Sequence, residues 1–203
     1  MLGHEMRNPL APISTALQLM ELSTERAFAM ERTVIKRQVD HLTRLVDDLL
    51  DISRITSGKI EIKRKHATVA SLVADALEIV SPMLEKRHHQ LTISVPDDLV
   101  VDVDAFRMSQ VISNLLSNAA KYTEQSGHIR IEAGREGDEV WISVRDDGVG
   151  IAPDMLRHVF DLFTQEPQAN DRAHGGLGLG LSIVRSLVVM HGGNVTAESS
   201  GRG

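Results

Sequence analysis

The sequence contains no cysteine, few aromatic residues and no long apolar run, and each absence removes a class of function. Without cysteine there are no disulfide bonds, no thiolate zinc sites and no cysteine nucleophile. Aromatic residues make up 3% of the 203 residues, which argues against stacking of nucleic-acid bases. No apolar stretch is long enough to cross a membrane, and no signal peptide is present. The net charge of −6 argues against nonspecific nucleic-acid binding.

The first quarter of the chain has the repeat of two packed helices, over residues 4–22 and 28–53. The apolar side chains that keep a heptad rhythm are Leu10, Ile13, Leu17 and Met20, then Ile35, Leu42, Leu45, Leu49 and Ile52, with Gln38 breaking it once. The short connection, roughly residues 23–27, predicts antiparallel packing. A lone hairpin buries too little apolar surface to be stable, so we expect two copies to form a four-helix bundle. The alternative is that the hairpin packs against the rest of its own chain.

Beyond Ser57-Gly58 the pattern becomes mixed, so the fold class that we expect is α+β. Alternating residues predict strands over residues 59–63, 91–95, 129–133 and 140–145, and a last strand that begins at 195–197. Helices are expected over residues 68–87, opened by Thr68, over 105–121, capped by Asp104, and over 177–191, closed by a glycine pair. Residues 161–176 have no periodicity and are interpreted as a long functional loop.

A glycine-rich run at residues 175–181, GGLGLGL, precedes the last expected helix. Glycines at 176, 178 and 180 let backbone N–H groups approach a ligand closely, because no Cβ intervenes. The positive end of the following helix points at the same place, which favours a phosphate group. Such turns are common, so the run indicates a nucleotide only together with two further segments.

The first of these segments is the helix over residues 105–121. Asn114, Asn118 and Lys121 share one face at i, i+4 and i+7, whereas the buried face carries Met108, Val111, Ile112, Leu115 and Ala119. Amide oxygens suit Mg²⁺, and a lysine beside them suits phosphate oxygens. The alternative is a solvated polar face, although asparagine is a poor helix former without a local benefit.

The second segment is DDGVGI at residues 146–151, which follows an expected strand. The carboxylate of Asp146 can accept a hydrogen bond from an exocyclic amine such as that of adenine, and Gly148 and Gly150 allow a tight turn beneath a flat ring. An ordinary Asp-Gly turn is the alternative interpretation.

Five segments in order resemble the H, N, G1, F and G2 boxes of two-component sensor histidine kinases: HEMRNPL, NLLSNAAKYT, DDGVGI, VFDLFTQ and GGLGLGL. The resemblance implies a dimerisation and phosphotransfer hairpin over residues 1–57, truncated at its N-terminus. It also implies a catalytic ATP-binding domain over residues 58–203, truncated at its C-terminus. That domain would be an α/β sandwich of the type shared with gyrase and MutL.

The resemblance also assigns residues. His4 resembles the phosphoacceptor, Glu5 its acidic neighbour and Asn8 the residue that positions water during dephosphorylation of the regulator. Asn118 resembles the Mg²⁺ ligand. The other positions that match the ATP site are Asn114, Lys121, Tyr122, Asp146, Gly148, Gly150, Phe160, Phe163, Gly176, Leu177, Gly178, Leu179 and Gly180, where Phe160 and Phe163 would anchor a lid. Many members have threonine or serine where this chain has Leu177, so a hydroxyl contact is expected to be missing.

The function implied is ATP-dependent autophosphorylation of His4, with ATP and Mg²⁺ as cofactors, and phosphoryl transfer to an aspartate of a response regulator. Phosphatase activity toward the regulator is a further expectation. The expected partners are the regulator's receiver domain and a second copy of the chain, without nucleic acid or membrane contact. A cytoplasmic location is expected, with any membrane anchor in segments outside this sequence. Two alternatives stay open, namely an ATP-driven conformational module and a scaffold that binds regulators without catalysis.

Overall fold

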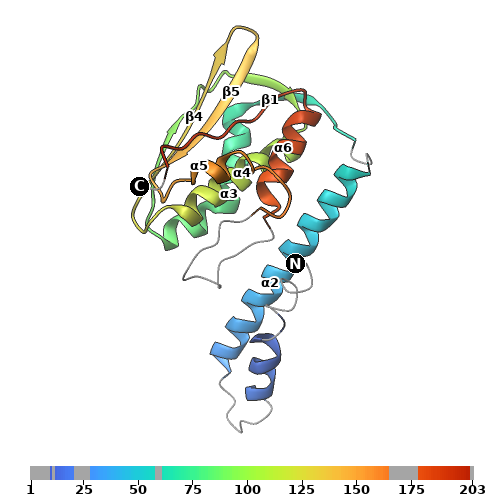
Figure 1. The fold of residues 1–203 in the computed structure, drawn as a ribbon, viewed down its shortest axis with the longest axis vertical. Helices are drawn as coiled ribbons and strands as arrows, with labels where there is room; N and C mark the ends of the chain where they lie inside the picture. Colours follow the sequence, from blue (N-terminus) through green and yellow to red (C-terminus); the bar gives the residue numbers. More distant parts are fainter. Residues whose placement is uncertain (1–9, 11, 21–27, 58–60, 165–177, 202–203) are drawn as a thin grey trace.

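A long helix followed by a mixed α/β region makes up the protein, seen in a computed structural model (Figure 1). The structure describes residues 10, 12–20, 28–57, 61–164 and 178–201. Residues 12–20 are helical, which agrees with the first expected helix where it is described. The predictions for His4, Glu5, Asn8, Gly176 and Leu177, for the connection at 23–27 and for most of the loop at 161–176 lie outside the described residues.

The second expected helix is α2, Ala29–Thr56, which ends three residues later than the sequence predicted. Its C-terminal half lies beside α6, Gly180–Met190, and its N-terminal half extends away from the α/β region (Figure 1). No helix within the described ranges is long and apolar enough to cross a lipid bilayer.

The strand expected over residues 59–63 is wrong where the structure describes it, at residues 61–63. Residues 61–64 have no regular structure, and the strand is β1, Lys65–Thr68. It pairs antiparallel with β3, Val100–Val103, a strand that the sequence did not predict. The N–H of Lys63 donates instead to the Asp104 carboxylate at 3.0 Å, so the alternating residues before β1 have no ladder partner among the described residues.

A three-stranded sheet has the order β2-β4-β5, with β2, Gln90–Ser94, parallel to β4, His128–Glu136. Strand β5, Glu139–Asp146, runs antiparallel to β4. Gly137, at a φ of 59°, makes the tight turn between them. Strands β2, β4 and β5 confirm the strands expected over residues 91–95, 129–133 and 140–145. Asp146 lies at the end of β5, opposite Ile129 of β4.

Both predicted helix caps are confirmed. The Thr68 side chain accepts a hydrogen bond from the Ser71 N–H at the start of α3, Val69–Lys86. The Asp104 side chain accepts one from Arg107 N–H at the start of α4, Ala105–Tyr122. Because each cap satisfies a backbone donor that the helix leaves unpaired, local sequence was enough to locate both helix starts.

The main core lies between α3, α4 and the sheet. Val69, Leu72 and Ala76 of α3 meet Ile112 and Leu116 of α4, and all five are buried. Strand β4 adds the buried residues Ile129, Ile131 and Ala133 to the same cluster. On α4, Val111, Ile112 and Ala119 of the expected apolar face are fully buried, and Met108 and Leu115 are partly buried.

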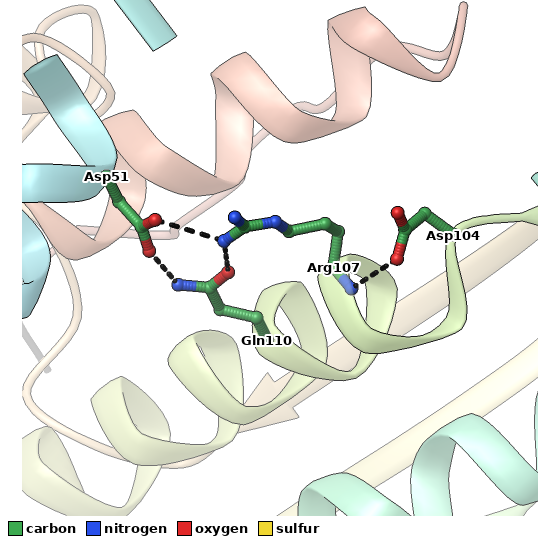
Figure 2. Close-up of polar contacts among 4 residues, drawn as sticks. All are labelled: Asp51, Asp104, Arg107 and Gln110. Carbon is green, nitrogen blue, oxygen red and sulfur yellow. Dashed lines mark hydrogen bonds and ion pairs between the residues drawn. The ribbon is translucent and has the colours of Figure 1, made fainter. Parts of the chain in front are cut away.

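A second apolar cluster joins α2 to the α/β region. Leu45, Leu49 and Ile52 of α2 pack with α6 residues Ile183 and Leu187. Polar contacts flank this cluster, because Asp51 of α2 binds Arg107 and Gln110 of α4 (Figure 2). This part of the hairpin seam thus packs against its own chain, the arrangement that we gave as the alternative. Pairing with a second copy stays a prediction.

The strand expected from Val195 to Ala197 is wrong, since residues 193–201 have no regular structure. A side-chain hydrogen bond ties this segment to the loop after β5, because the Ile151 N–H donates to the Ser199 hydroxyl at 2.9 Å. A short helix, α5, Pro153–Leu156, follows that loop and was not predicted.

Candidate nucleotide-binding site

The polar face of α4 carries Asn114, Asn118 and Lys121, all partly buried. The Asn114 side-chain amide donates to the Gly180 carbonyl at 3.4 Å, which joins α4 to the first residue of α6. Asn118 lies one turn further along, and its side chain has no hydrogen-bond partner among the described residues. Asn114 therefore connects two helices, whereas the Asn118 amide remains available to a ligand.

At the end of α4, Lys121 and Tyr122 contact each other. The Lys121 ammonium donates to the Tyr122 hydroxyl at 3.0 Å and lies 4.7 Å from the centre of the same ring. The contact with the Tyr122 ring holds the Lys121 charge near one position. The other two N–H donors of the Lys121 ammonium group are not used by this contact. The pair therefore presents positive charge and an aromatic surface one turn beyond Asn118.

The loop after β5 is held in a defined conformation. Asp146 Oδ1 accepts the Gly148 N–H at 3.0 Å, and the Val149 N–H donates to the Tyr122 carbonyl at 3.2 Å. A Cβ at Gly148 would lie 2.5 Å from that carbonyl oxygen, and Gly150 has a φ of 67° beside the Gly201 carbonyl. Glycine is therefore required at both positions, and one oxygen of Asp146 is left to face a ligand.

Two contacts that anchor this loop were missed by sequence reasoning. Asp147 Oδ1 accepts the His128 N–H at 2.8 Å, while Ser199 accepts the Ile151 N–H. In the sequence, Asp147 is simply one residue of the DDGVGI segment, and a lone serine such as Ser199 gives no sequence signal. Both side chains fix the backbone of the loop rather than face the expected ligand.

The segment that ends at Thr164 approaches the glycine-rich run. Gly178 has a φ of 70°, and a Cβ there would lie 2.6 Å from the Thr164 carbonyl oxygen. Phe163 also has a positive φ, 62°, which is costly for a bulky residue. Phe160 is partly buried, as an anchor should be, whereas Phe163 is 39% exposed.

The start of α6 presents backbone donors. Its N-cap residue, Leu179, makes no side-chain capping hydrogen bond, and the Leu179 side chain is 1% exposed within the α2–α6 cluster. Leu179 therefore anchors the helix in the core and can offer a ligand only its backbone. The unpaired N–H groups of the first turn and the helix dipole favour an anion at this end.

One open cavity of about 3690 Å³ brings most of these residues together. It is larger than a single small-molecule site, so it joins several grooves. The expected site residues that line it are Asn114, Asn118, Lys121, Tyr122, Asp146, Gly148, Gly150, Phe160, Gly178, Leu179 and Gly180. Phe163 does not line it.

The described residues also test whether Mg²⁺ fits. They hold no cluster of three or more histidine and acidic side chains that would make an all-protein metal site. Mg²⁺ keeps several waters and binds through one or two protein oxygens together with phosphates. The unpartnered amide of Asn118, between the Asp146 loop and the start of α6, fits that requirement.

Comparison with known families matches two parts of the chain to family models. Residues 103–203 match the family model described as the histidine kinase-, DNA gyrase B- and HSP90-like ATPase. Residues 1–58 match the His Kinase A (phospho-acceptor) domain. The matches and the fold together define a protein in which a phospho-acceptor hairpin precedes an ATPase-type α/β domain.

Individual relatives give the same result. The sensor histidine kinase WalK of Bacillus subtilis is 34% identical over 206 residues, which cover 97% of this chain and 33% of WalK. The structure of full-length ShkA in complex with AMPPNP superposes with a TM-score of 0.70 at 28% identity, covering 99% of this chain and 42% of ShkA. The structure of the histidine kinase ThkA in complex with the response regulator protein TrrA has a TM-score of 0.69 at 22% identity and covers 95% of this chain and 54% of ThkA, which shows the fold alone.

The chain belongs to the sensor histidine kinases of two-component systems. It spans about a third of the length of WalK and corresponds to the part of the family that combines phospho-acceptor and ATP-binding regions.

Proposed function

We propose that this chain binds Mg²⁺-ATP in the cavity between α4, the Asp146 loop and the start of α6, and phosphorylates its own His4. The observation that carries the proposal is that two contacts bring three distant sequence segments together: Asn114 of α4 donates to the Gly180 carbonyl at 3.4 Å, and the Val149 N–H donates to the Tyr122 carbonyl at the end of α4 at 3.2 Å. The match of residues 1–58 to a phospho-acceptor domain supports an acceptor histidine in that part of the chain. For domain organisation we propose residues 1–57 as the phosphotransfer hairpin and 58–203 as the ATP-binding domain.

Each group around the cavity has a chemical role in this proposal. The free oxygen of Asp146 accepts a hydrogen bond from the adenine amine, and Gly148 and Gly150 let the loop turn beneath the ring. Asn118 binds Mg²⁺, which neutralises charge on the phosphates when it is bound. Lys121 and the N–H groups at Gly178 and Gly180 face the phosphates, with Gly176 and Leu177 in the same run.

The phosphoryl transfer itself depends on His4, Glu5 and Asn8. A nitrogen of the neutral imidazole attacks the terminal phosphorus of ATP, the bond from that phosphorus to the bridging oxygen breaks, and ADP leaves. Glu5, next in the sequence, accepts the imidazole proton and orients the ring. The phosphoryl group then passes to an aspartate carboxylate of a response regulator, and Asn8 positions water when the regulator is dephosphorylated.

The partners follow from the same assignment. We propose that the hairpin pairs with a second copy of the chain into a four-helix bundle. The exposed apolar residues Val39, Val46 and Leu50 of α2 support this, because they lie outside the cluster with α6. The regulator partner is supported by the family to which the chain belongs. We place the reaction on the cytoplasmic side of the cell.

Labelling with [γ-³²P]ATP and Mg²⁺ tests the proposal. The expected product is protein-bound label that is acid-labile and base-stable, and that is lost in His4→Ala and kept in His41→Ala. ATP hydrolysis without label would support the conformational module instead, and neither reaction would support the scaffold. Asn8→Ala should keep autophosphorylation and reduce dephosphorylation of an added regulator.

A further inference from the structure

Arg87, the residue that follows α3, reaches across to the C-terminal end of α4. Its Nη1 donates to the carbonyl oxygens of Ala120, Lys121 and Thr123 at 3.1, 2.9 and 3.0 Å. The side chain is partly buried and lies more than thirty residues away in sequence. A single guanidinium nitrogen thus contacts three backbone carbonyls at one helix end.

The carbonyls of Ala120 and Lys121 are among the acceptors that an α-helix leaves without partners in its last turn, and Thr123 is the residue that follows the helix. The Thr123 N–H donates to the Ala119 carbonyl, and the Val149 N–H of the Asp146 loop donates to the Tyr122 carbonyl. Arg87 donates to the two remaining carbonyls of the last turn, those of Ala120 and Lys121. Its positive charge also complements the negative end of the helix. It therefore acts as the C-cap of α4, although it belongs to a different element.

Neighbouring contacts hold Arg87 itself in place. The Ser126 N–H donates to the Arg87 carbonyl at 2.9 Å, and the His89 ring contacts the Ala120 carbonyl at 3.0 Å. His88 and Ser126 both have positive φ angles, 56° and 66°, which such residues adopt only when surrounding contacts require it. The end of α3 and the turn after α4 are thereby joined in one arrangement.

This arrangement lies directly behind the candidate site. The capped turn carries Lys121 and Tyr122, and its Tyr122 carbonyl fixes the loop of Asp146. Arg87, Lys121, Tyr122 and Val149 also line one cavity of about 550 Å³. Loss of the cap would let the last turn of α4 fray, and both the lysine and the adenine-facing loop would lose their fixed positions.

We propose that Arg87 is a positioning residue for ATP: it holds the last turn of α4 so that Lys121, Tyr122 and the Asp146 loop have the geometry that nucleotide binding requires. The inference rests on the proposed function, because it assumes that ATP occupies this cavity. Arg87 acts through backbone carbonyls and is not itself assigned a contact with the nucleotide.

The test compares Arg87→Met, Arg87→Lys and a control, Asp104→Ala, which removes a cap at the opposite end of α4. Binding of trinitrophenyl-ATP and the KM and kcat of autophosphorylation are measured on the whole chain. Arg87→Met is expected to raise Kd and KM about tenfold, or about 1.4 kcal/mol, with kcat within about twofold. Arg87→Lys should recover most of the affinity, because an ammonium group keeps the positive charge and has three N–H donors for the same carbonyls. The control should change Kd less than about twofold.

Fluorescence of Trp141, the single tryptophan, checks that each variant is folded at the assay temperature. If Arg87→Met is unfolded, Arg87→Lys and Arg87→Gln are compared instead, and the lysine variant should bind more tightly. Equal Kd values for the Arg87 variants and the Asp104→Ala control would overturn the positioning role. Absence of nucleotide binding by the unmodified chain would instead overturn the proposed function.

Discussion

Asp51 of α2 and Arg107 of α4 form an ion pair of 3.0 Å in which both side chains are mostly buried, at 14% and 16% exposed (Figure 2). Gln110 closes the arrangement, because its amide donates to the other Asp51 oxygen at 2.6 Å and accepts from Arg107 at 2.9 Å. Both oxygens of Asp51 are thus used, next to the apolar cluster of Leu45 and Ile183. Helix α2 is therefore attached to the α/β region by both polar and apolar contacts.

A double-mutant cycle on Asp51→Ala and Arg107→Met should give a coupling energy of about 1–2 kcal/mol, since contacting, hydrogen-bonded charges couple measurably. Urea unfolding followed by Trp141 fluorescence and helical circular dichroism measures it. The matched control is Arg130 and Glu132, which lie 3.9 Å apart with 57% and 28% exposure. Their coupling should stay below about 0.5 kcal/mol. Equal coupling in the two pairs would contradict a specific attachment of α2.

Asp104 predicts a pH dependence of stability. Burial by itself raises the pKa of Asp104, but the hydrogen bonds from the Lys63 and Arg107 N–H groups and the nearby positive charge of Arg107 together lower it below its ordinary value. A lowered pKa in the folded state means that the carboxylate stabilises the protein above its unfolded pKa of about 4. This contribution is lost as the pH falls through the folded value.

Asp104→Ala should therefore lower the free energy of unfolding by about 1 kcal/mol at pH 7. The difference from the unmodified protein should shrink once the pH is below about 4. Urea titrations at a series of pH values follow it. Asp104→Asn, which keeps a capping oxygen without the charge, should lose less stability at pH 7. A difference that stays constant with pH would show that the carboxylate charge is not involved.

Gly178 and Gly137 offer a matched pair of glycine substitutions. Both have positive φ angles, 70° and 59°, so alanine is strained by about 1–2 kcal/mol at either position. Only at Gly178 does the new Cβ meet backbone, the Thr164 carbonyl oxygen at 2.6 Å, whereas at Gly137 it meets nothing within 4 Å. Gly178→Ala should weaken ATP binding by about tenfold or more, and Gly137→Ala should only lower the melting temperature. Calorimetric titration with ATP distinguishes them, and equal affinities would remove Gly178 from the site.

Asn118→Ala should abolish the Mg²⁺-dependent part of ATP binding, because the amide oxygen is the metal ligand in our proposal. Titrations with ATP in Mg²⁺ and in EDTA should then give nearly the same Kd. The control is Asn194→Ala, at an exposed position after α6, which should keep the dependence on Mg²⁺ of the unmodified chain. If Asn118→Ala retains that dependence, the assignment of Mg²⁺ to Asn118 is wrong.

Local signals in the sequence located several parts of the fold. Thr68 and Asp104 marked helix starts correctly, because a cap is a contact between residues three apart. The strand expected over residues 59–63 failed because alternation does not say whether a partner strand exists, and the partner of β1 lies more than thirty residues away in β3.

The sequence by itself determined the family, the order of the two regions and the chemical types of the candidate site residues, because these depend on motifs of adjacent residues and on short helical periods. Tertiary structure decided how those residues are held: Arg87 against the end of α4, Ser199 against the Asp146 loop and Asp51 against Arg107. Each of these contacts joins residues more than thirty positions apart. No local pattern encodes such a pairing, because it depends on how whole helices and strands pack.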